Sequence, residues 1–352
     1  MIDYRKKTIT KGQQQLRCGY TTGTCAAAAA KAAAVALLTG EICRDVAICL
    51  PGGENILLET ETLEHQKNCV KCGVIKDAGD DPDITNGLMI CADVEKNTSG
   101  EICIDGGEGV GRVTQPGLDQ PVGAAAINSV PRKMIQEAVE SVCRQYHYTE
   151  GLMVTISIPK GRETAEKTLN PMLGIVGGLS VLGTTGIVEP MSEKALIDTI
   201  AVDIRRHRAQ GEDILVMAPG NYGLDYLKAA CDIHSEQVIK ISNFVGDSID
   251  LAVCEGASGI VLAGHIGKLI KVAGGIMNTH SHQADARMEI LTAYAAVAGA
   301  DGETLRLVMK AVTTDAGMEI LQRCGLLSET MQLILGKIQA HVQKRAGSRV
   351  ET

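Results

Sequence analysis

Residues 17–38 read RCGYTTGTCAAAAAKAAAVALL, a loop of glycine and threonine followed by a segment composed almost entirely of alanine. Such a segment predicts a helix, because alanine has the highest helix propensity. Its short side chains let neighbouring elements approach closely. Lys31 interrupts the segment, and alanine is only weakly apolar, so we do not expect it to span a membrane.

The bulk composition limits the class of protein. The chain has 352 residues, 45% of them hydrophobic, which predicts two domains with a sizeable core. A net charge of −8 and an aromatic content of 2% argue against a nucleic-acid binder, which needs basic and base-stacking surfaces. The first residues, MIDYRKKTITKGQQQ, lack an apolar signal-peptide core, which favours a cytoplasmic protein without a membrane partner.

The cysteines give no clear metal site. There are 12 of them, mostly scattered singly, as free thiols are in the cytoplasm. Only Cys69 and Cys72 form a CxxC pair, which His65 precedes. A structural zinc site needs a fourth ligand, so we expect no bound metal. The patterns GxGxxG, GxxxxGK[ST], GxSxG and HExxH are absent from the sequence.

Short strand-like runs follow the alanine segment and predict an α+β domain over residues 1–160. These runs are Val46–Leu50, Asn55–Glu59, Val70–Lys76, Leu88–Val94 and Glu101–Asp105. A helical segment, NSVPRKMIQEAVESVCRQYHY, and a further strand, LMVTISIP, complete the predicted domain.

Residues 161–352 predict an α/β Rossmann-like domain with a mostly parallel sheet and C-terminal helices. Four apolar runs that lead into glycine predict its strands: LGIVGG, DILVMAP, QVIKIS and SGIVLAG. Helical segments alternate with these runs. More helical segments follow from Gln283 onward and offer a surface for a homodimer contact.

Glycine-rich turns follow the predicted parallel strands, at the edge where such sheets bind ligands. These turns are Gly174–Gly178, Pro219–Gly223, Asn243–Gly246 and Gly264–Gly267. The stretch Leu173–Gly186 also carries the hydroxyls of Thr184 and Thr185, which a plain turn does not need. This stretch is either a ligand-binding loop or a buried strand and turn.

Three other stretches concentrate charged side chains. Asp77–Asp83 gathers carboxylates that we interpret as a tight turn, with a substrate-facing Asp as the alternative. In the loop Glu108–Gly123, Arg112 either binds a carboxylate or is solvated. Gly264–Arg287 carries more polar and ionisable side chains than a capping loop requires, which favours a functional site. Its polar residues are His265, Lys268, Lys271, His280, Ser281, His282, Asp285 and Arg287.

Several stretches between residues 16 and 290 are recognisable together. They are RCGYTTGTCAAAAAKAA, VIKDAGDDPD, IDGGEGVGRVTQPGL, PVGAAAINSVPR, TLNPMLGIVGGLSVLGTTGIVEPMS, APGNYG, GHIGKLIKVAGGIMNTHS and ADAR. In sequence and in order, they resemble the CbiD family of cobalt-precorrin-5B C1-methyltransferases. The resemblance implies an α+β domain followed by a Rossmann-like domain. It also implies methyl transfer from S-adenosylmethionine to C1 of cobalt-precorrin-5B, giving cobalt-precorrin-6A in anaerobic cobalamin biosynthesis.

Given this resemblance, we expect S-adenosylmethionine as cofactor, held by the two glycine turns around Gly174–Gly186 and Pro219–Gly223. A carboxylate, Glu189 or Asp225, would bind the ribose hydroxyls. The candidate cofactor-binding residues are Gly174, Gly177, Gly178, Thr184, Thr185, Glu189, Gly220 and Asn221. Cobalt would arrive inside the tetrapyrrole substrate, so the protein would need no metal site of its own.

The substrate carries many carboxylates, so an acidic protein must supply local cations. The candidates are Arg17, Lys31, Arg112, Lys268, Lys271 and Arg287, with the hydroxyl of Ser281. Thr21, Thr22 and Thr24 precede or begin the alanine helix. There they either bind a substrate anion at the helix N-terminus or serve only close packing.

The reaction itself requires proximity more than activation, because a sulfonium methyl group is already electrophilic. If a proton is moved, His265, His280 or Asp105 would take it, and the sequence does not choose among them. A nicotinamide-dependent reductase and a non-enzymatic tetrapyrrole carrier are the alternative functions. Separate binding measurements with S-adenosylmethionine, NADH and a cobalt tetrapyrrole distinguish the three.

Overall fold

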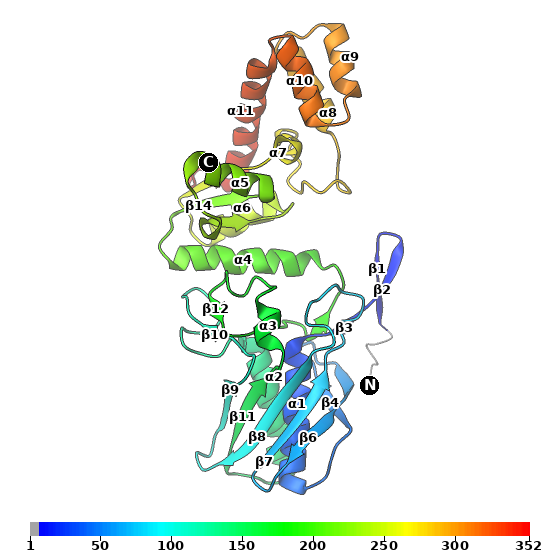
Figure 1. The fold of residues 1–352 in the computed structure, drawn as a ribbon, viewed down its shortest axis with the longest axis vertical. Coiled ribbons are helices and arrows are strands. Elements are labelled where there is room, and N and C mark those ends of the chain that lie inside the picture. The colour runs from blue at the N-terminus through cyan, green and yellow to red at the C-terminus, as the bar shows by residue number, and fades with distance from the viewer. Residues whose placement is uncertain (1–6) are drawn as a thin grey trace. The chain divides into compact units, whose positions relative to one another are not determined.

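The computed structural model describes residues 7–352 and divides the chain into two compact units, one ending at Ser192 and the other beginning at Glu193 (Figure 1). The boundary expected from the sequence, after residue 160, lies earlier. The difference arises because β12 (Ile175–Val176) pairs with β10 (Arg112–Val113), and β13 (Ile187–Val188) pairs with β3 (Gly19–Tyr20). Residues 161–192 are therefore part of the first unit.

A five-stranded sheet forms the centre of the first unit. Its strand order is β6 (Glu61–His65), β7 (Cys69–Ile75), β8 (Met89–Asn97), β11 (Gly151–Ser157) and β9 (Ile102–Gly106). Neighbouring strands are antiparallel except β11 and β9, which are parallel. Helix α2 (Ser129–Gln145) lies in the connection between these two strands, as a parallel pair requires. The sequence predicted this α+β character.

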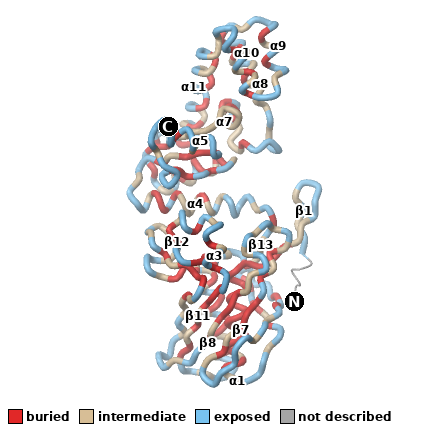
Figure 2. Tube along the Cα trace, viewed as in Figure 1, coloured by how far each residue is buried: buried red, intermediate tan, exposed pale blue. Residues whose placement is uncertain are grey.

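The alanine segment forms α1 (Thr22–Thr39), which packs against α2 and against β7 and β8. Within residues 7–352, α1 is the helix long and apolar enough to cross a membrane, but 78% of it is buried inside the fold. Figure 2 shows this burial along the helix and the adjoining strands. A β-carbon on Gly23 would lie 2.7 Å from Pro131 Cγ, so α1 and α2 approach closely at that end. The short side chains thus allow neighbours to pack on several sides of α1.

Smaller elements complete the first unit. Strands β1 (Thr8–Lys11) and β2 (Gln14–Arg17) form an antiparallel hairpin, and β4 (Asp45–Cys49) pairs with β5 (Asn55–Glu59). The short helix α3 (Gly161–Ala165) follows β11. The sequence does not predict the hairpin β1–β2, because its strands lack a regular alternation of apolar and polar residues.

The second unit contains a parallel sheet with strand order β15 (Val238–Lys240), β14 (Ile214–Ala218) and β16 (Gly259–Leu262). These strands correspond to three of the four predicted runs. The fourth, LGIVGG, was wrongly placed in this sheet, because its strand β12 pairs antiparallel with β10 in the first unit. The second unit is thus α/β with a parallel sheet of three strands.

Helices cover both faces of this sheet. Helix α5 (Asn221–Cys231) packs on the face that carries Val216. Helices α4 (Glu193–Ala209) and α6 (Val245–Cys254) pack on the opposite face, where Leu215 and Met217 are fully buried. The successive crossovers therefore leave the sheet on opposite sides.

The remaining helices pack into the hydrophobic core that contains Leu215 and Met217. Their bounds are α7 (Ile266–Ala273), α8 (Arg287–Val297), α9 (Gly302–Lys310), α10 (Thr314–Arg323) and α11 (Leu327–Ala346). The backbone of Glu351 pairs with that of Gly259 and Ile260, so the C-terminus extends the edge of the sheet at β16. The sequence predicted these C-terminal helices.

Candidate functional site

The order β15–β14–β16 creates a topological switch point between β14 and β16. The chain leaves β14 toward β15 through α5, and it reaches β16, on the other side of β14, through α6. In open parallel sheets a crevice forms at the carboxyl ends of the strands on either side of such a reversal, and ligands bind there. Here the turns after these two strands are Pro219–Gly220 and Gly264–His265. We call this region the switch-point site.

Glycine brings the two turns of the switch-point site into contact. A β-carbon on Gly223 would lie 2.4 Å from the Ala263 carbonyl oxygen, and one on Gly264 would lie 2.8 Å from Pro219 Cγ. The ammonium of Lys268, on α7, donates to the Pro219 carbonyl oxygen. Burial, and secondarily the Lys271 charge, lowers the pKa of Lys268. Both glycines are therefore needed for packing, and Lys268 ties the two turns together.

Gly220 differs from these glycines because it faces open space. The nearest atom to an added β-carbon is Lys268 Nζ, at 3.7 Å. Gly220 is also the N-cap of α5, and no side chain caps this helix. The first turn of α5, with Asn221 at its start, thus combines polar N–H groups with unfilled space. This is the chemistry expected of an anion-binding helix start.

His265 is the N-cap of α7 and is held at both ring nitrogens. Its Nδ1 accepts from the Gly267 amide at 3.1 Å, and its Nε2 lies 3.5 Å from Asp315 Oδ1. Because a backbone N–H group can only donate, Nδ1 carries no proton, and the neutral form of the His265 ring has its proton on Nε2. The ring of Tyr222, on α5, lies with its centroid 5.1 Å from that of His265. Tyr222 thus spans the two turns of the site.

Lys271 organises the loop that follows α7. The residue is 3% exposed, and its ammonium donates to the carbonyl oxygens of Thr279 and Ala284, at 3.1 and 2.9 Å. The same loop carries His280, whose Nδ1 accepts from the His282 amide at 3.2 Å. Ser281 beside it is exposed. Lys271 is therefore committed to holding the loop.

Arg287 begins α8 and makes a bidentate ion pair with Asp285, with distances of 2.6 and 2.9 Å. This pairing raises the pKa of Arg287 and lowers that of Asp285. The guanidinium side chain keeps 33% of its surface exposed. It can therefore accept a second carboxylate partner through its remaining N–H groups.

The threonines at the start of α1 bind the loop at residues 182–186 of the same unit. Thr22 Oγ1 donates to the Leu182 carbonyl at 3.1 Å, and Thr24 Oγ1 donates to the Gly186 carbonyl at 2.6 Å. Thr21 Oγ1 caps the helix by accepting from the Thr24 amide at 3.2 Å. All three are buried, which differs from the anion-binding expectation and matches the packing alternative.

The stretch Leu173–Gly186 is part of the first unit and not a turn after a parallel strand. Gly178 is buried against Gly109, and a β-carbon on Gly174 would lie 2.7 Å from Gln115 Cγ. Only Gly177, Thr184 and Thr185 are exposed among the expected cofactor contacts of this stretch; Glu189, just beyond it, is also exposed. The premise that placed these residues at a strand end of the parallel sheet was wrong.

The cationic candidates of the first unit also have internal partners. Arg17 makes a bidentate pair with Asp77 at 2.6 and 2.9 Å, and Lys31 donates to the Ala47 carbonyl at 2.8 Å. Arg112 binds Asp105 through two hydrogen bonds of 2.7 and 2.8 Å, which lower the pKa of the Asp105 carboxyl. Arg112 nevertheless keeps 43% of its side-chain surface exposed.

The carboxylates of Asp77–Asp83 join this turn to other segments of the first unit through hydrogen bonds and ion pairs. Asp80 accepts from the Arg17 amide at 2.6 Å, and Asp81 accepts from the Met191 amide at 2.9 Å. Asp83 pairs with the buried Lys76. The stretch forms the turn that the sequence predicts, and a substrate-facing role for one Asp stays a prediction.

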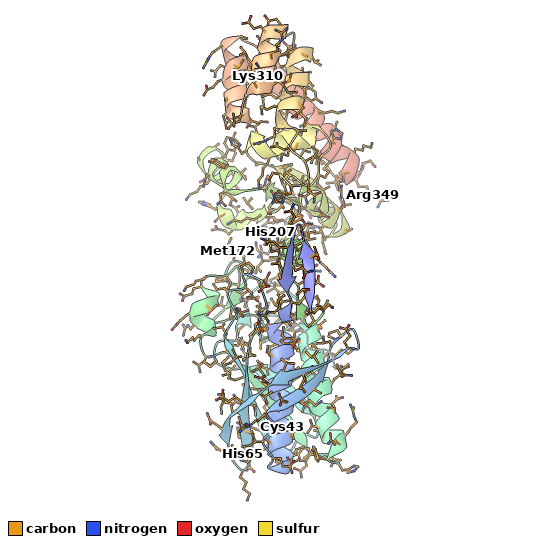
Figure 3. All side chains as sticks on the ribbon, turned by 90° about the vertical axis from the view of Figure 1, so that its right-hand side faces the viewer. Cys43, His65, Met172, His207, Lys310 and Arg349 are labelled. Atoms are coloured by element: carbon orange, nitrogen blue, oxygen red, sulfur yellow. The ribbon has the colours of Figure 1, made fainter. Side chains whose placement is uncertain are left out.

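The CxxC pair lies on β7, where residues three apart point to opposite faces of the sheet. Cys72 is fully buried, whereas Cys69 is partly exposed on the other face. His65, labelled in Figure 3, contacts the Ala36 carbonyl oxygen at 3.4 Å. Among residues 7–352, no group of three or more His, Cys, Asp or Glu side chains is arranged to bind a metal ion.

Thus the switch-point site unites Gly220, Asn221, His265 and Lys268 of the expected residues. Sequence reasoning missed Tyr222 and Asp315. Tyr222 carried a detectable signal, because it lies in APGNYG beside a predicted strand end and the chain has only 7 Tyr and 1 Phe. Asp315 carried no such signal in the sequence, because it lies fifty residues after His265.

Comparison with known proteins identifies the family of this chain. The family model described as CbiD matches residues 9–190, and the model described as CbiD, C-terminal domain, matches residues 278–352. The chain belongs to the CbiD family.

Relatives in the CbiD family resemble the chain over most of its length. A cobalt-precorrin-5B C(1)-methyltransferase of Ruminiclostridium cellulolyticum is 48% identical, with 97% of this chain and 90% of that protein covered. The enzyme of the same name from Alkaliphilus metalliredigens is 46% identical, with 91% and 84% covered. A crystal structure of the cobalamin biosynthesis protein cbiD from Archaeoglobus fulgidus matches with a TM-score of 0.44 and 28% identity, covering 81% of this chain and 89% of that one.

Proposed function

We propose that this chain is an S-adenosylmethionine-dependent enzyme that methylates C1 of cobalt-precorrin-5B in cobalamin biosynthesis. Membership of the CbiD family, and the high identity to relatives named for this reaction, support the activity. Cobalt belongs to the substrate in this proposal. The switch point between β14 and β16 is the observation that supports a location for the methyl donor.

The methyl donor fits the switch-point site. The sheet there, with helices on both faces, is the core of a Rossmann-like domain in this proposal. The uncapped start of α5 suits the donor's carboxylate, and the open space at Gly220 leaves room for it. Asp225, one turn along α5, suits the ribose hydroxyls. When bound, S-adenosylmethionine supplies a methyl group on a sulfonium.

The remaining task of the site is to position the reactants, which is a proximity effect. His265 and His280 both accept an amide hydrogen bond at Nδ1, so each neutral ring presents an Nε2–H donor rather than a free basic nitrogen. Asp105 is a poor base because Arg112 stabilises its charged form. We therefore assign His280 as a hydrogen-bond donor, His265, whose Nε2 faces Asp315, as a contact of the Tyr222 ring, and Asp105 as the residue that positions Arg112.

For the substrate carboxylates, we retain two separate candidates from the sequence-based set, Arg112 of the first unit and Arg287 of the second. Each is fixed by an aspartate while its guanidinium stays partly exposed, at 43% and 33% of the side-chain surface. A pre-oriented guanidinium loses less conformational freedom when it binds a further carboxylate. Lys31 and Lys271 are not retained, because backbone carbonyls already occupy their partly or wholly buried ammonium groups.

Calorimetry on the Gly220→Val variant tests the donor site. Apart from its chain neighbours, the nearest atom to a β-carbon at Gly220 is the flexible end of Lys268, at 3.7 Å, so the fold accepts the β-carbon while the side chain fills the space proposed for the ligand. We expect the affinity for S-adenosylmethionine to fall by at least about tenfold, equivalent to ~1.4 kcal/mol. NADH should not bind either protein.

The matched control is Gly52→Val, in the turn between β4 and β5, where an added β-carbon has no neighbour within 4 Å. This variant should bind S-adenosylmethionine like the wild type. Undiminished affinity in Gly220→Val would remove the donor from the switch-point site. NADH binding without S-adenosylmethionine binding would favour the reductase, and tetrapyrrole binding alone would favour the carrier.

A further inference from the structure

The switch-point site carries an exposed aromatic side chain that packing of the fold does not explain. Tyr222 is 73% exposed although it lies in the first turn of α5. The chain holds no Trp, 1 Phe and 7 Tyr. Tyr146 and Tyr226 are exposed as well, but Tyr222 differs from them in the contact of its ring with His265, on the other turn of the site. Its position between the two glycine turns indicates a ligand contact rather than a core contact.

The surroundings of Tyr222 hold its ring at the mouth of the site. The ring contacts His265 at 5.1 Å between centroids, with the two planes inclined at 44°. His265 is itself fixed, through the Gly267 amide on one nitrogen and Asp315 near the other. An imidazole with a partner near each nitrogen keeps a fixed orientation beside the Tyr222 ring. The remainder of the tyrosine ring faces solvent.

We propose that Tyr222 is a positioning residue that holds the positively charged sulfonium of the methyl donor against its ring. Aromatic faces attract onium cations through the ring quadrupole. This inference rests on the proposed function, since it takes the donor's carboxylate to lie at the start of α5. The sulfonium is separated from that carboxylate by a short three-carbon chain, which keeps it near the residue that follows Asn221.

Such a contact gives the enzyme a means of releasing its product. After methyl transfer the donor becomes a neutral thioether, which no longer gains the cation–aromatic attraction. Tyr222 therefore favours the methylated donor over the demethylated product. It also restricts the direction of the S–CH₃ bond, because the cation lies over the ring face and not beside it.

The experiment compares binding of S-adenosylmethionine and S-adenosylhomocysteine by calorimetry in the full chain. In Tyr222→Leu we expect the affinity for S-adenosylmethionine to fall by roughly 3- to 30-fold, with little change for S-adenosylhomocysteine. Tyr222→Phe keeps a ring with the same quadrupole, so it should retain the wild-type preference. The exposure of Tyr222 makes a loss of folding in these variants unexpected, and circular dichroism checks it.

Tyr226→Leu is the matched control. Tyr226 lies one turn further along α5 and is 64% exposed, and its substitution should leave both affinities unchanged. Equal losses for both ligands in Tyr222→Leu, or no loss for either, would overturn the role of Tyr222 while leaving the donor site intact. Absence of binding of both ligands to the wild type would overturn the donor site as well.

Discussion

Gly178 lies so close to Gly109 that a β-carbon on Gly178 would be 2.3 Å from the Gly109 carbonyl oxygen. The Leu179 amide donates to that same oxygen at 2.9 Å, which draws the two segments together. The glycine pair thus permits two backbones to pack directly against each other. This close approach explains the glycine at position 178 without a ligand.

The first prediction follows from this contact. Gly178→Ala should lower the free energy of unfolding of the first unit by about 1–3 kcal/mol or more, because backbone atoms have to move apart. Urea denaturation followed by circular dichroism measures the change. Gly52→Ala, at a position with open space, is the control and should change stability little. Equal stability of the two variants would show that the contact is not tight.

The second prediction concerns the buried threonines at the start of α1. Thr24→Val removes the donor to the Gly186 carbonyl and should cost about 1–2 kcal/mol of stability. Thr24→Ser keeps the hydroxyl and should cost less. Tetrapyrrole affinity of the folded protein should be the same in both variants. A stable Thr24→Val protein with weakened tetrapyrrole binding would restore the anion-binding interpretation.

The third prediction concerns two helical glycines with opposite surroundings. Gly336 lies within α11, and an added β-carbon meets nothing within 4 Å, so Gly336→Ala should stabilise the second unit by about 1 kcal/mol. In α10, a β-carbon on Gly317 would lie 2.6 Å from Leu291 Cδ2, so Gly317→Ala should destabilise it. Thermal unfolding checks the two signs; shifts in the same direction would contradict the packing of α8 against α10.

The fourth prediction concerns the ion pair of Lys76 and Asp83. Burial alone raises the pKa of Asp83, but the Lys76 charge and the Thr85 hydrogen bonds outweigh it, so the pKa lies below its ordinary value. A carboxyl with a lowered pKa in the folded state stabilises fully above its unfolded pKa of about 4, and loses this contribution as the pH falls through the folded value.

Asp83→Asn should therefore be less stable than the wild type by about 3–5 kcal/mol near neutral pH, since it leaves the 3%-exposed Lys76 without its carboxylate. Urea denaturation should show this difference narrowing below about pH 4. The double variant Lys76→Met with Asp83→Asn should recover part of the loss. A difference that stays constant into strong acid would contradict the lowered pKa of Asp83.

The local sequence pattern was sufficient to predict β14, β15 and β16, because each is a short apolar run with a glycine-containing segment after it. The same local pattern misplaced LGIVGG. Strand β12 has that composition too, but its partner is Arg112–Val113, about sixty residues earlier, and the choice of partner depends on long-range packing.

The candidate site was predicted in part for a similar reason. Gly220, Asn221 and His265 follow strand ends, so the rule for parallel sheets located them. The pairing of Arg17 with Asp77, and that of Arg112 with Asp105, could not be inferred from residue type. A sequence shows that a cationic side chain is present, whereas only the fold shows that an aspartate pairs with it.

The most direct test of the central claim is a crystal structure of the full chain with S-adenosylhomocysteine. We predict that the ligand lies at the switch-point site, with its carboxylate at the backbone N–H groups that begin α5 and its sulfur beside the Tyr222 ring. Ligand bound instead along Leu173–Gly186 in the first unit would contradict the proposed donor site.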